Sequence, residues 1–399
     1  MSLRASLVGP ALLVLTACSS RATTDEEPAP PPSAMAVSGA GSARPLTAPS
    51  APPTPHPGSA TASPSARPVT TGSAHATAPG SASGKPGAAP GLPADDGRPL
   101  HLETQDELLA MIPVRTFSEK EIKRRGDPHD FLRKNVGPDG PSRMNQGNKA
   151  IAGHEVSRAQ CLEGLRDVVL QTDEQRRVCG ADYMVPVYKK GDPSKARYCI
   201  DIFEAPNRPC ELPYVWVGPT QASMMCELEG KRLCAQEEWV QACRGDPEGK
   251  EDWLYAYGND LDLTACNTNK PARASGEPVC DPDSVSSTWK TCHTNTEPAG
   301  AFPRCRSRFG VFDMHGNVAE EMVRYDPEEG GLVSQLKGSA FFYVDVARKH
   351  NEPQKKGGPE TYADHCAHDP RWHVEPMRQA WHVNYHLGFR CCKSIKPGG

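Results

Sequence analysis

The chain has 399 residues, of which 37% are hydrophobic and 24% are charged, and its formal net charge at pH 7 is −4. This near balance of charge, without a basic stripe or a nucleic-acid motif in the sequence, excludes a nucleic-acid-binding protein. Composition and motifs divide the chain into four segments: residues 1–17, 18–98, 99–182 and 183–395.

Residues 1–17 have the features of a bacterial lipoprotein signal peptide. Arg4 precedes an apolar run, Leu7 to Leu15, that is too short to span a bilayer and is followed by Thr-Ala and Cys18. Cleavage before Cys18 would leave its thiol linked to diacylglycerol, whose acyl chains anchor the protein in membrane lipid. The alternative is an ordinary signal peptide. Ser19 is not the aspartate of inner-membrane retention, so we expect a lipid-anchored protein of the cell envelope, at the outer membrane and facing the periplasm or the surface.

Residues 18–98 consist of the lipidated cysteine and a tether. From Ser19 to Arg98 the sequence is dominated by Ala, Pro, Ser, Thr and Gly and contains no aromatic residue. Such a composition cannot bury a core, so we expect disorder and a reach on the order of 50 Å. The tether would hold a folded domain away from the membrane.

Residues 99–182 predict a short helical appendage. Ser118 and Glu121 form a capping-box pattern. A second helix is predicted from Ser157 to Leu170, with one buried face. That face would contain Cys161, Leu162, Leu165, Val168 and Val169, and a disulfide between Cys161 and Cys179 could flank it.

Residues 183–395 predict a domain with few regular elements. Strands are expected at Tyr183–Tyr188 and Arg197–Phe203. A helix from Thr220 to Glu229 would have Thr220 as its N-cap, with Gly230 after it in the left-handed conformation. A second helix would run from Gln236 to Cys243. Beyond these helices Gly, Pro, Asn, Asp and Ser dominate, so long loops tied by disulfides are expected.

The chain contains 15 cysteines, of which one is in the lipobox and fourteen lie elsewhere. An even number outside the lipobox, in an exported chain, indicates a disulfide framework. Zinc ligation is the rival interpretation, but the sequence has no C-x-x-C pair. The spacing alone does not determine which cysteines pair.

Three segments in fixed order resemble a known family. They are Gly-Lys-Arg-Leu-Cys-Ala-Gln-Glu-Glu-Trp at 230–239 followed by Ala-Cys-Arg-Gly at 242–245, Phe-Gly-Val-Phe-Asp-Met-His-Gly-Asn-Val-Ala-Glu-Glu at 309–321, and Gly-Phe-Arg-Cys at 388–391. Together they resemble the formylglycine-generating enzyme, or sulfatase-modifying-factor, domain (FGE-sulfatase). The resemblance implies an α+β, C-type-lectin-like fold with little regular secondary structure and many disulfides.

The resemblance also implies a structural calcium site. Asp313, Gly316, Val318 and Glu320 fall on positions that bind calcium in the family through two side chains and two backbone carbonyls. Oxygen ligands of this kind suit calcium. Asn267 matches a ligand of a second family site, although its acidic partner has no counterpart here. The family's tryptophans in this motif are replaced by Ala319 and Glu321.

Two disulfides follow from the same resemblance. Cys226 would pair with Cys391. A further family cysteine matches Cys243, but the position of its usual partner is not a cysteine in this chain, which leaves Cys234 or Cys366.

The catalytic cysteines of the family are missing. True formylglycine generators hold Cu(I) between two thiolates, the ligands that Cu(I) requires. After Lys337-Gly-Ser339, these two positions are Phe342 and Ala347. We therefore expect neither copper nor iron to be bound, and no oxidation of a substrate cysteine by the family mechanism.

A cluster of histidines keeps a second function open. The residues that would form a candidate cleft are Ser339, His365, His368, Trp372, His373, His382, His386 and Arg390. Imidazoles can bind a transition metal or exchange protons. The interpretation that we favour is that these histidines serve in hydrogen bonding and aromatic packing.

Three functional classes follow from the sequence. The first is a tethered, non-oxidase domain that binds a peptide, a glycan or an envelope protein. The alternative is an oxidoreductase or other metal-dependent enzyme, with a site rebuilt around Cys366 and the histidines. A third class is a purely structural envelope lipoprotein. The ligand cannot be named, because specificity lies in long loops.

Overall fold

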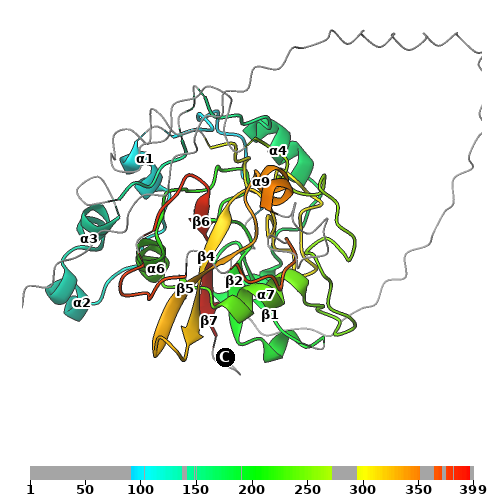
Figure 1. Ribbon diagram of the computed structural model, residues 1–399. Helices are drawn as coiled ribbons and strands as arrows, with labels where there is room; N and C mark the ends of the chain where they lie inside the picture. Colours follow the sequence, from blue (N-terminus) through cyan, green and yellow to red (C-terminus); the bar gives the residue numbers. More distant parts are fainter. Residues whose placement is uncertain are drawn as a thin grey trace, which may run out of the picture. The chain divides into compact units, whose positions relative to one another are not determined.

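The computed structural model describes residues 91–395, except 103, 137–141, 148, 150, 190, 272–293, 351–363, 371–373 and 381, and except the side chains of 348–350 (Figure 1). These residues belong to one compact unit, residues 80–399. Cys18 and most of the predicted tether lie outside them. No helix of the described part is both long enough and apolar enough to cross a bilayer.

Five short helices precede the first strand. They are α1 (Gln105–Ala110), α2 (Glu119–Arg125), α3 (Pro128–Asn135), α4 (Arg158–Leu165) and α5 (Asp173–Cys179). Four begin with a Ser or Thr that accepts the N–H of the third helical residue, whose own side chain bonds back. The predicted box of Ser118 and Glu121 is one of them. α4 is shorter than predicted, and Val169 is 65% exposed, because the β-branched Val168–Val169 pair beyond Leu165 does not extend the helix.

The first sheet has four antiparallel strands in the order β1-β2-β7-β3. They are β1 (Met184–Val187), β2 (Tyr198–Asp201), β3 (Arg232–Leu233) and β7 (Cys391–Ser394). β1 and β2 lie within the two strands predicted from sequence, and the short helix η1 (Pro193–Lys195) lies between them. The last strand therefore pairs with one of the first, which places the GFRC segment at the centre of the domain.

Helices α6 (Pro219–Leu228) and α7 (Gln236–Arg244) match the two predicted in this region, with one correction. The N-cap of α6 is Gly218 and not Thr220, because Pro219 suits the first helical position, where no N–H is needed. The Thr220 hydroxyl instead bonds the carbonyl oxygens of Met377 and Ala380. Gly230 has a φ of 74°, as predicted.

The second sheet was missed from sequence, where only loops were expected. β4 (Ala319–Asp326) and β5 (Gly331–Lys337) form an antiparallel hairpin, and β6 (Leu387–Phe389) lies parallel to β4. Figure 1 shows the hairpin projecting from the domain, with α9 (Tyr343–His350) after it. Glu320 and Glu321 in β4 are both buried. Two adjacent acidic residues do not fit the apolar pattern that predicts a buried strand.

Six disulfides connect the described segments. They are Cys161–Cys210, Cys179–Cys199, Cys226–Cys391, Cys234–Cys392, Cys243–Cys366 and Cys266–Cys305. The suggested Cys161–Cys179 bridge is wrong, because Cys161 in α4 bonds Cys210 in the loop after β2 and Cys179 in α5 bonds Cys199 in β2. So many disulfides indicate that the protein functions outside the cytoplasm.

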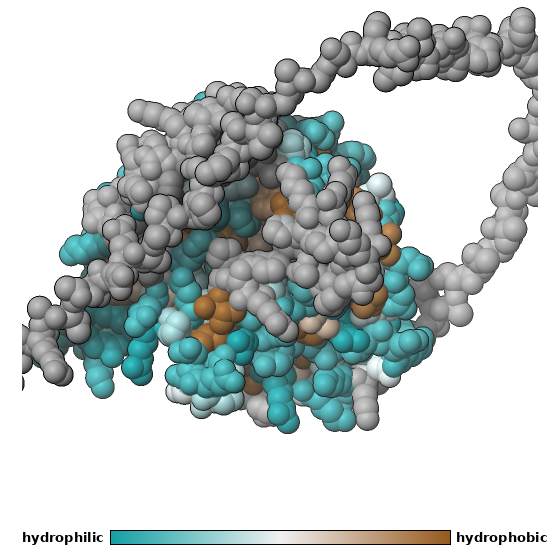
Figure 2. All heavy atoms as spheres, in the orientation of Figure 1, coloured by the Kyte–Doolittle hydropathy of each residue, from teal (hydrophilic) through white to brown (hydrophobic). Residues whose placement is uncertain are grey.

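The core is divided into several apolar clusters, of which two are large. One surrounds Trp239, Phe312 and Met322 between α7 and the sheets. The other joins α1 and α3 to α6 and includes Leu108, Leu132, Met225 and Phe389. The coloured atoms on the face in Figure 2 are mainly hydrophilic, with small hydrophobic patches. Because the second cluster contains residues of α1 and α3 as well as α6, the appendage shares a core with the domain.

Candidate functional site

The loop that leads into β4 is held in an unusual backbone conformation. Asp313 and Asn317 have positive φ angles of 55° and 58°, and Gly316 has one of 71°. A Cβ on Gly316 would lie 2.2 Å from the carbonyl oxygen of Asn267, so only glycine fits this contact. The loop is therefore fixed against residue 267, another predicted calcium position.

Three carboxylates are buried beside this loop: Glu204, Asp313 and Glu320. Arg390, which is fully buried, donates to both oxygens of Glu320 at 2.5 and 2.6 Å and also bonds the carbonyl oxygen of Phe312. Trp239 Nε1 donates to Glu320 at 2.9 Å. Arg390 is therefore an internal structural cation and does not line an open cleft.

The other two carboxylates receive backbone and amide donors. Asp313 accepts the N–H of Gly300 at 2.7 Å. Glu204 accepts the N–H of Val318 at 3.1 Å and the amide of Asn317 at 2.6 Å. These bonds fix the loop geometry without supplying a positive charge.

Two of the three acids, Glu204 and Asp313, have raised pKa values. Burial, and then repulsion by Asp313 and Glu320, holds the pKa of Glu204 well above its usual range. Burial raises the pKa of Asp313 to about 7, and Glu320 adds to the effect. One arginine lies among the three carboxyl groups, and it bonds only Glu320 of the three.

The predicted calcium ligands are partly engaged by protein groups. Both oxygens of Glu320 bond Arg390, whereas Asp313 accepts the backbone N–H of Gly300. The Asn267 amide donates to the carbonyl oxygen of Asn295 and to Asn317. Calcium at either site stays a prediction.

The positions of the copper cysteines are filled by apolar groups. Phe342 is 5% exposed and contacts the rings of Phe341, Tyr385 and His386, with centroids 5.1, 5.8 and 4.8 Å away. Ala347 lies on α9 and is buried. Ser339 accepts the N–H of Gly316 at 2.9 Å. We call Phe341, Phe342, Tyr385 and His386 the aromatic cluster.

The structure does not bring the predicted cleft histidines together. His365 and His368 form an edge-to-face pair at 5.7 Å, and Lys337 donates to the carbonyl oxygen of His368. His386 belongs to the aromatic cluster, whereas His382 lies near the charge of Glu375. Trp372 and His373 lie outside the described residues. The described members divide among separate environments.

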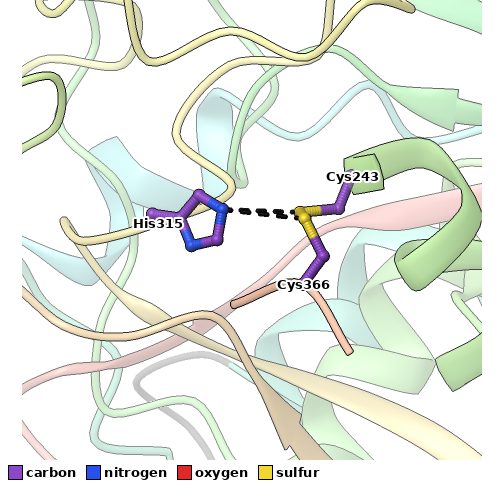
Figure 3. Close-up of side chains that lie close together, drawn as sticks. All are labelled: Cys243, His315 and Cys366. Atoms are coloured by element: carbon purple, nitrogen blue, oxygen red, sulfur yellow. Dashed lines mark hydrogen bonds between the residues drawn. A yellow bond between two sulfur atoms is a disulfide. The ribbon is translucent and has the colours of Figure 1, made fainter. Parts of the chain in front are cut away.

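A histidine that the sequence analysis did not select lies beside a disulfide. Figure 3 shows His315 Nε2 facing the bridge between Cys243 and Cys366, at 3.6 and 3.7 Å from the two sulfurs. These three ligand atoms lie within 4.8 Å of one another. The sulfurs are bonded to each other, so in this state they are not thiolates and the group cannot bind a metal as a Cys₂His site.

The hydrogen bonds of His315 define its protonation. Ala256 N–H donates to Nε2 at 3.0 Å, so the proton is on Nδ1, which lies 3.3 Å from Asp364. The rings of Tyr255 and Tyr257 flank the imidazole. His315 therefore joins three loops as a structural residue. Its place in the 309–321 motif was visible in the sequence, but its partners, 49 to 72 positions away, were not.

The structure agrees with the two disulfides that the resemblance implied, one with both partners named and one with its second partner left open. Cys226 pairs with Cys391, and Cys243 pairs with Cys366 and not with Cys234. Cys234 instead pairs with Cys392. Cys366 is consequently not a free thiol around which a redox site could form in this state.

Comparisons with known proteins identify relatives. A family model described as "Sulfatase-modifying factor enzyme 1-like domain" matches residues 141–395. It begins inside the segment assigned to the appendage, whose boundary at 182 stays a prediction. "Inactive C-alpha-formylglycine-generating enzyme 2" of Mus musculus is 28% identical over 34% of this chain and 39% of its own length. The Bos taurus protein of the same name is 30% identical over 28% and 32%. The chain thus spans about a third to two fifths of these relatives.

Two solved structures are also similar. PvdO from Pseudomonas aeruginosa is 15% identical, with a TM-score of 0.31 over 50% of this chain and 82% of that one. CarF is 14% identical, with a TM-score of 0.31 over 53% and 94%.

Proposed function

Because the chain belongs to the family of sulfatase-modifying factor enzyme 1-like domains, we propose that it is a non-oxidase member of that family, which uses its domain to bind a ligand in the cell envelope. The observation that carries the proposal is the pair of residues at the copper positions. Phe342 and Ala347 have no metal-binding atom, and Cu(I) chemistry needs two thiolates.

The packing around Phe342 supports the proposal. Its ring lies among Phe341, Tyr385 and His386, so a buried apolar contact replaces the metal ligand. The family's copper chemistry would require two thiolates, which Phe342 and Ala347 do not supply. The relatives from mouse and cattle, whose names call them inactive, are consistent with a domain that persists without the oxidase reaction.

Anchoring and presentation complete the proposal. The lipobox at Cys18 would attach the chain to lipid in the outer membrane, and the Ala/Pro/Ser-rich segment would separate the domain from the bilayer. A peptide, a glycan or an envelope protein would be the ligand. Calcium would be structural and would offset the excess of buried acid at Glu204, Asp313 and Glu320.

Counting free thiols tests the proposal. The full chain, purified in detergent, would be alkylated under denaturing, non-reducing conditions and weighed by intact mass. We expect no alkylation, because Cys18 would be lipidated and twelve further cysteines form the six described disulfides. Cys280 and Cys292 lie outside the described residues, and we expect them to be paired as well. Two alkylated cysteines, mapped beside the aromatic cluster and accompanied by bound copper, would overturn the non-oxidase assignment.

A further inference from the structure

The described residues form a cavity of about 440 Å³ at the start of α6, which we call the α6 cavity. Its walls come from the end of α3, the first turns of α6 and the segment before β6, and Figure 1 shows this last segment passing beside α6. The lining residues are Asn135, Arg143, Gly218, Thr220, Gln221, Met224, Arg378, Gln379, Ala380 and Val383. Its volume is in the range of small-molecule sites.

The walls of the α6 cavity are held by hydrogen bonds and packing. The Thr220 hydroxyl bonds the carbonyl oxygens of Met377 and Ala380, and Trp216 N–H donates to Asn384. Val383 also packs on the cluster that contains Val215 and Trp216. These contacts fix both sides of the cavity, so little ordering is needed when a ligand enters.

The charge of the lining is one-sided. Arg143 and Arg378 contribute two positive charges, and none of the ten lining residues is acidic. Neither arginine forms an ion pair with another of the described residues. Met224, Ala380 and Val383 supply an apolar surface between them.

Another cavity of the described residues, of about 510 Å³, differs in this respect. Its lining contains both acidic and basic residues, and two pairs of them form ion pairs, Lys231 with Glu229 and Arg98 with Glu211. An entering ion would have to compete with these pairs. Among its described lining residues, the α6 cavity has no acidic group that could pair with an arginine.

We propose that the α6 cavity binds a small organic anion, with a carboxylate or phosphate group at Arg143 and Arg378 and an apolar body against Met224 and Val383. Guanidinium groups bond both kinds of oxyanion strongly. This inference deepens the proposed binding function and rests on it. The α6 cavity lies near the aromatic cluster. Val383, which lines the cavity, and Tyr385, which belongs to the aromatic cluster, pack on the same group of buried apolar residues.

Calorimetric titration of the full chain in detergent tests the proposal with phenylacetate, phenyl phosphate and neutral 2-phenylethanol. We expect one site per chain for at least one anion, and binding of the alcohol at least about tenfold weaker. The preferred anion distinguishes a carboxylate ligand from a phosphate ligand. No binding of either anion, or equal binding of the alcohol, would overturn the proposal.

Variants assign the binding to the cavity. Arg143→Gln with Arg378→Gln should weaken the anion by at least about tenfold, and Gln221→Trp should block it by filling the space. The control, Arg124→Gln with Arg177→Gln, removes the same charge from exposed helical positions and should bind as the parent does. An equal loss of anion affinity in the control would show that the anion is attracted by the overall charge of the protein, and it would overturn the proposed site. The thiol count does not depend on the cavity, so a failure of the anion-binding test would leave the non-oxidase assignment intact.

Discussion

Glu321 stands where the family pattern has a tryptophan, and it is a carboxyl group inside an apolar region. It is 1% exposed, and its Oε2 has no hydrogen-bond partner among the described residues. Burial, assisted by the charge of Glu375, holds its pKa well above the usual range. A polar group in such a position destabilises the fold when it is ionised.

Replacing this carboxyl should stabilise the protein at high pH. The folded pKa is raised, so the penalty is absent below the unfolded value of about 4.3 and grows as the pH rises toward the folded pKa. Glu321→Gln should therefore raise the melting temperature by about 2–4 °C at pH 8 and by little at pH 4. The control Glu329→Gln, in the exposed turn, should show no such gain. A gain that is equal at both pH values would contradict the explanation.

Arg390 should be the most sensitive charged residue of the core. Arg390→Gln leaves Glu320 buried without its cation, which destabilises proteins by about 3–5 kcal/mol. Arg324→Gln breaks a more exposed ion pair with Asp326 and should change the free energy of unfolding by about 1 kcal/mol or less. Urea unfolding compares the two variants. Equal changes in the free energy of unfolding would show that the buried Arg390–Glu320 pair stabilises the fold no more than the more exposed pair does.

At the scale of elements, the loop before β4 is the place where calcium should act. A cation that binds only the native state raises stability by mass action, so EDTA should lower the melting temperature of the parent protein. Asp313→Asn should remove most of that difference, whereas Asp262→Asn, at a more exposed acid, should retain it. An unchanged EDTA effect in Asp313→Asn would eliminate this loop as the site.

Elements with local signals could be predicted from sequence, and those that depend on tertiary contacts could not. The Ser118 capping box and helices α6 and α7 have their signals within a few residues. The β4–β5 hairpin was missed because Glu320 and Glu321 read as exposed loop residues. Glu320 is buried only because Arg390, 70 positions later, neutralises it.

The candidate site was predictable to a similar extent. The motif gave Phe342 and Ala347 as replacements, and the structure places Phe342 in the aromatic cluster. The histidines at 365, 368, 382 and 386 are close in sequence but lie in different environments, because residues 364–370 and the segment before β6 pass different neighbours. The partners of His315 and the walls of the α6 cavity come from distant segments and have no sequence signal.

At the scale of the whole molecule, attachment to lipid depends on one residue. Cys18→Ser should move the protein from the membrane fraction to the soluble fraction, because the thioether that carries the acyl chains cannot form. Fractionation with immunodetection measures this, and mass spectrometry of the N-terminal peptide reports the lipid. Unchanged membrane attachment in Cys18→Ser would show that the lipobox is not the anchor.

The central claim is that this domain has lost the oxidase metal site. Titration of the full chain with Cu(I), against a competing chelator, tests it most directly, with Phe342→Cys plus Ala347→Cys as the matched variant that supplies two thiols. We predict that the parent takes up no copper and leaves a substrate peptide cysteine unoxidised in oxygen. Uptake of one tightly held copper ion by the parent, with oxidation of that cysteine, would contradict the account.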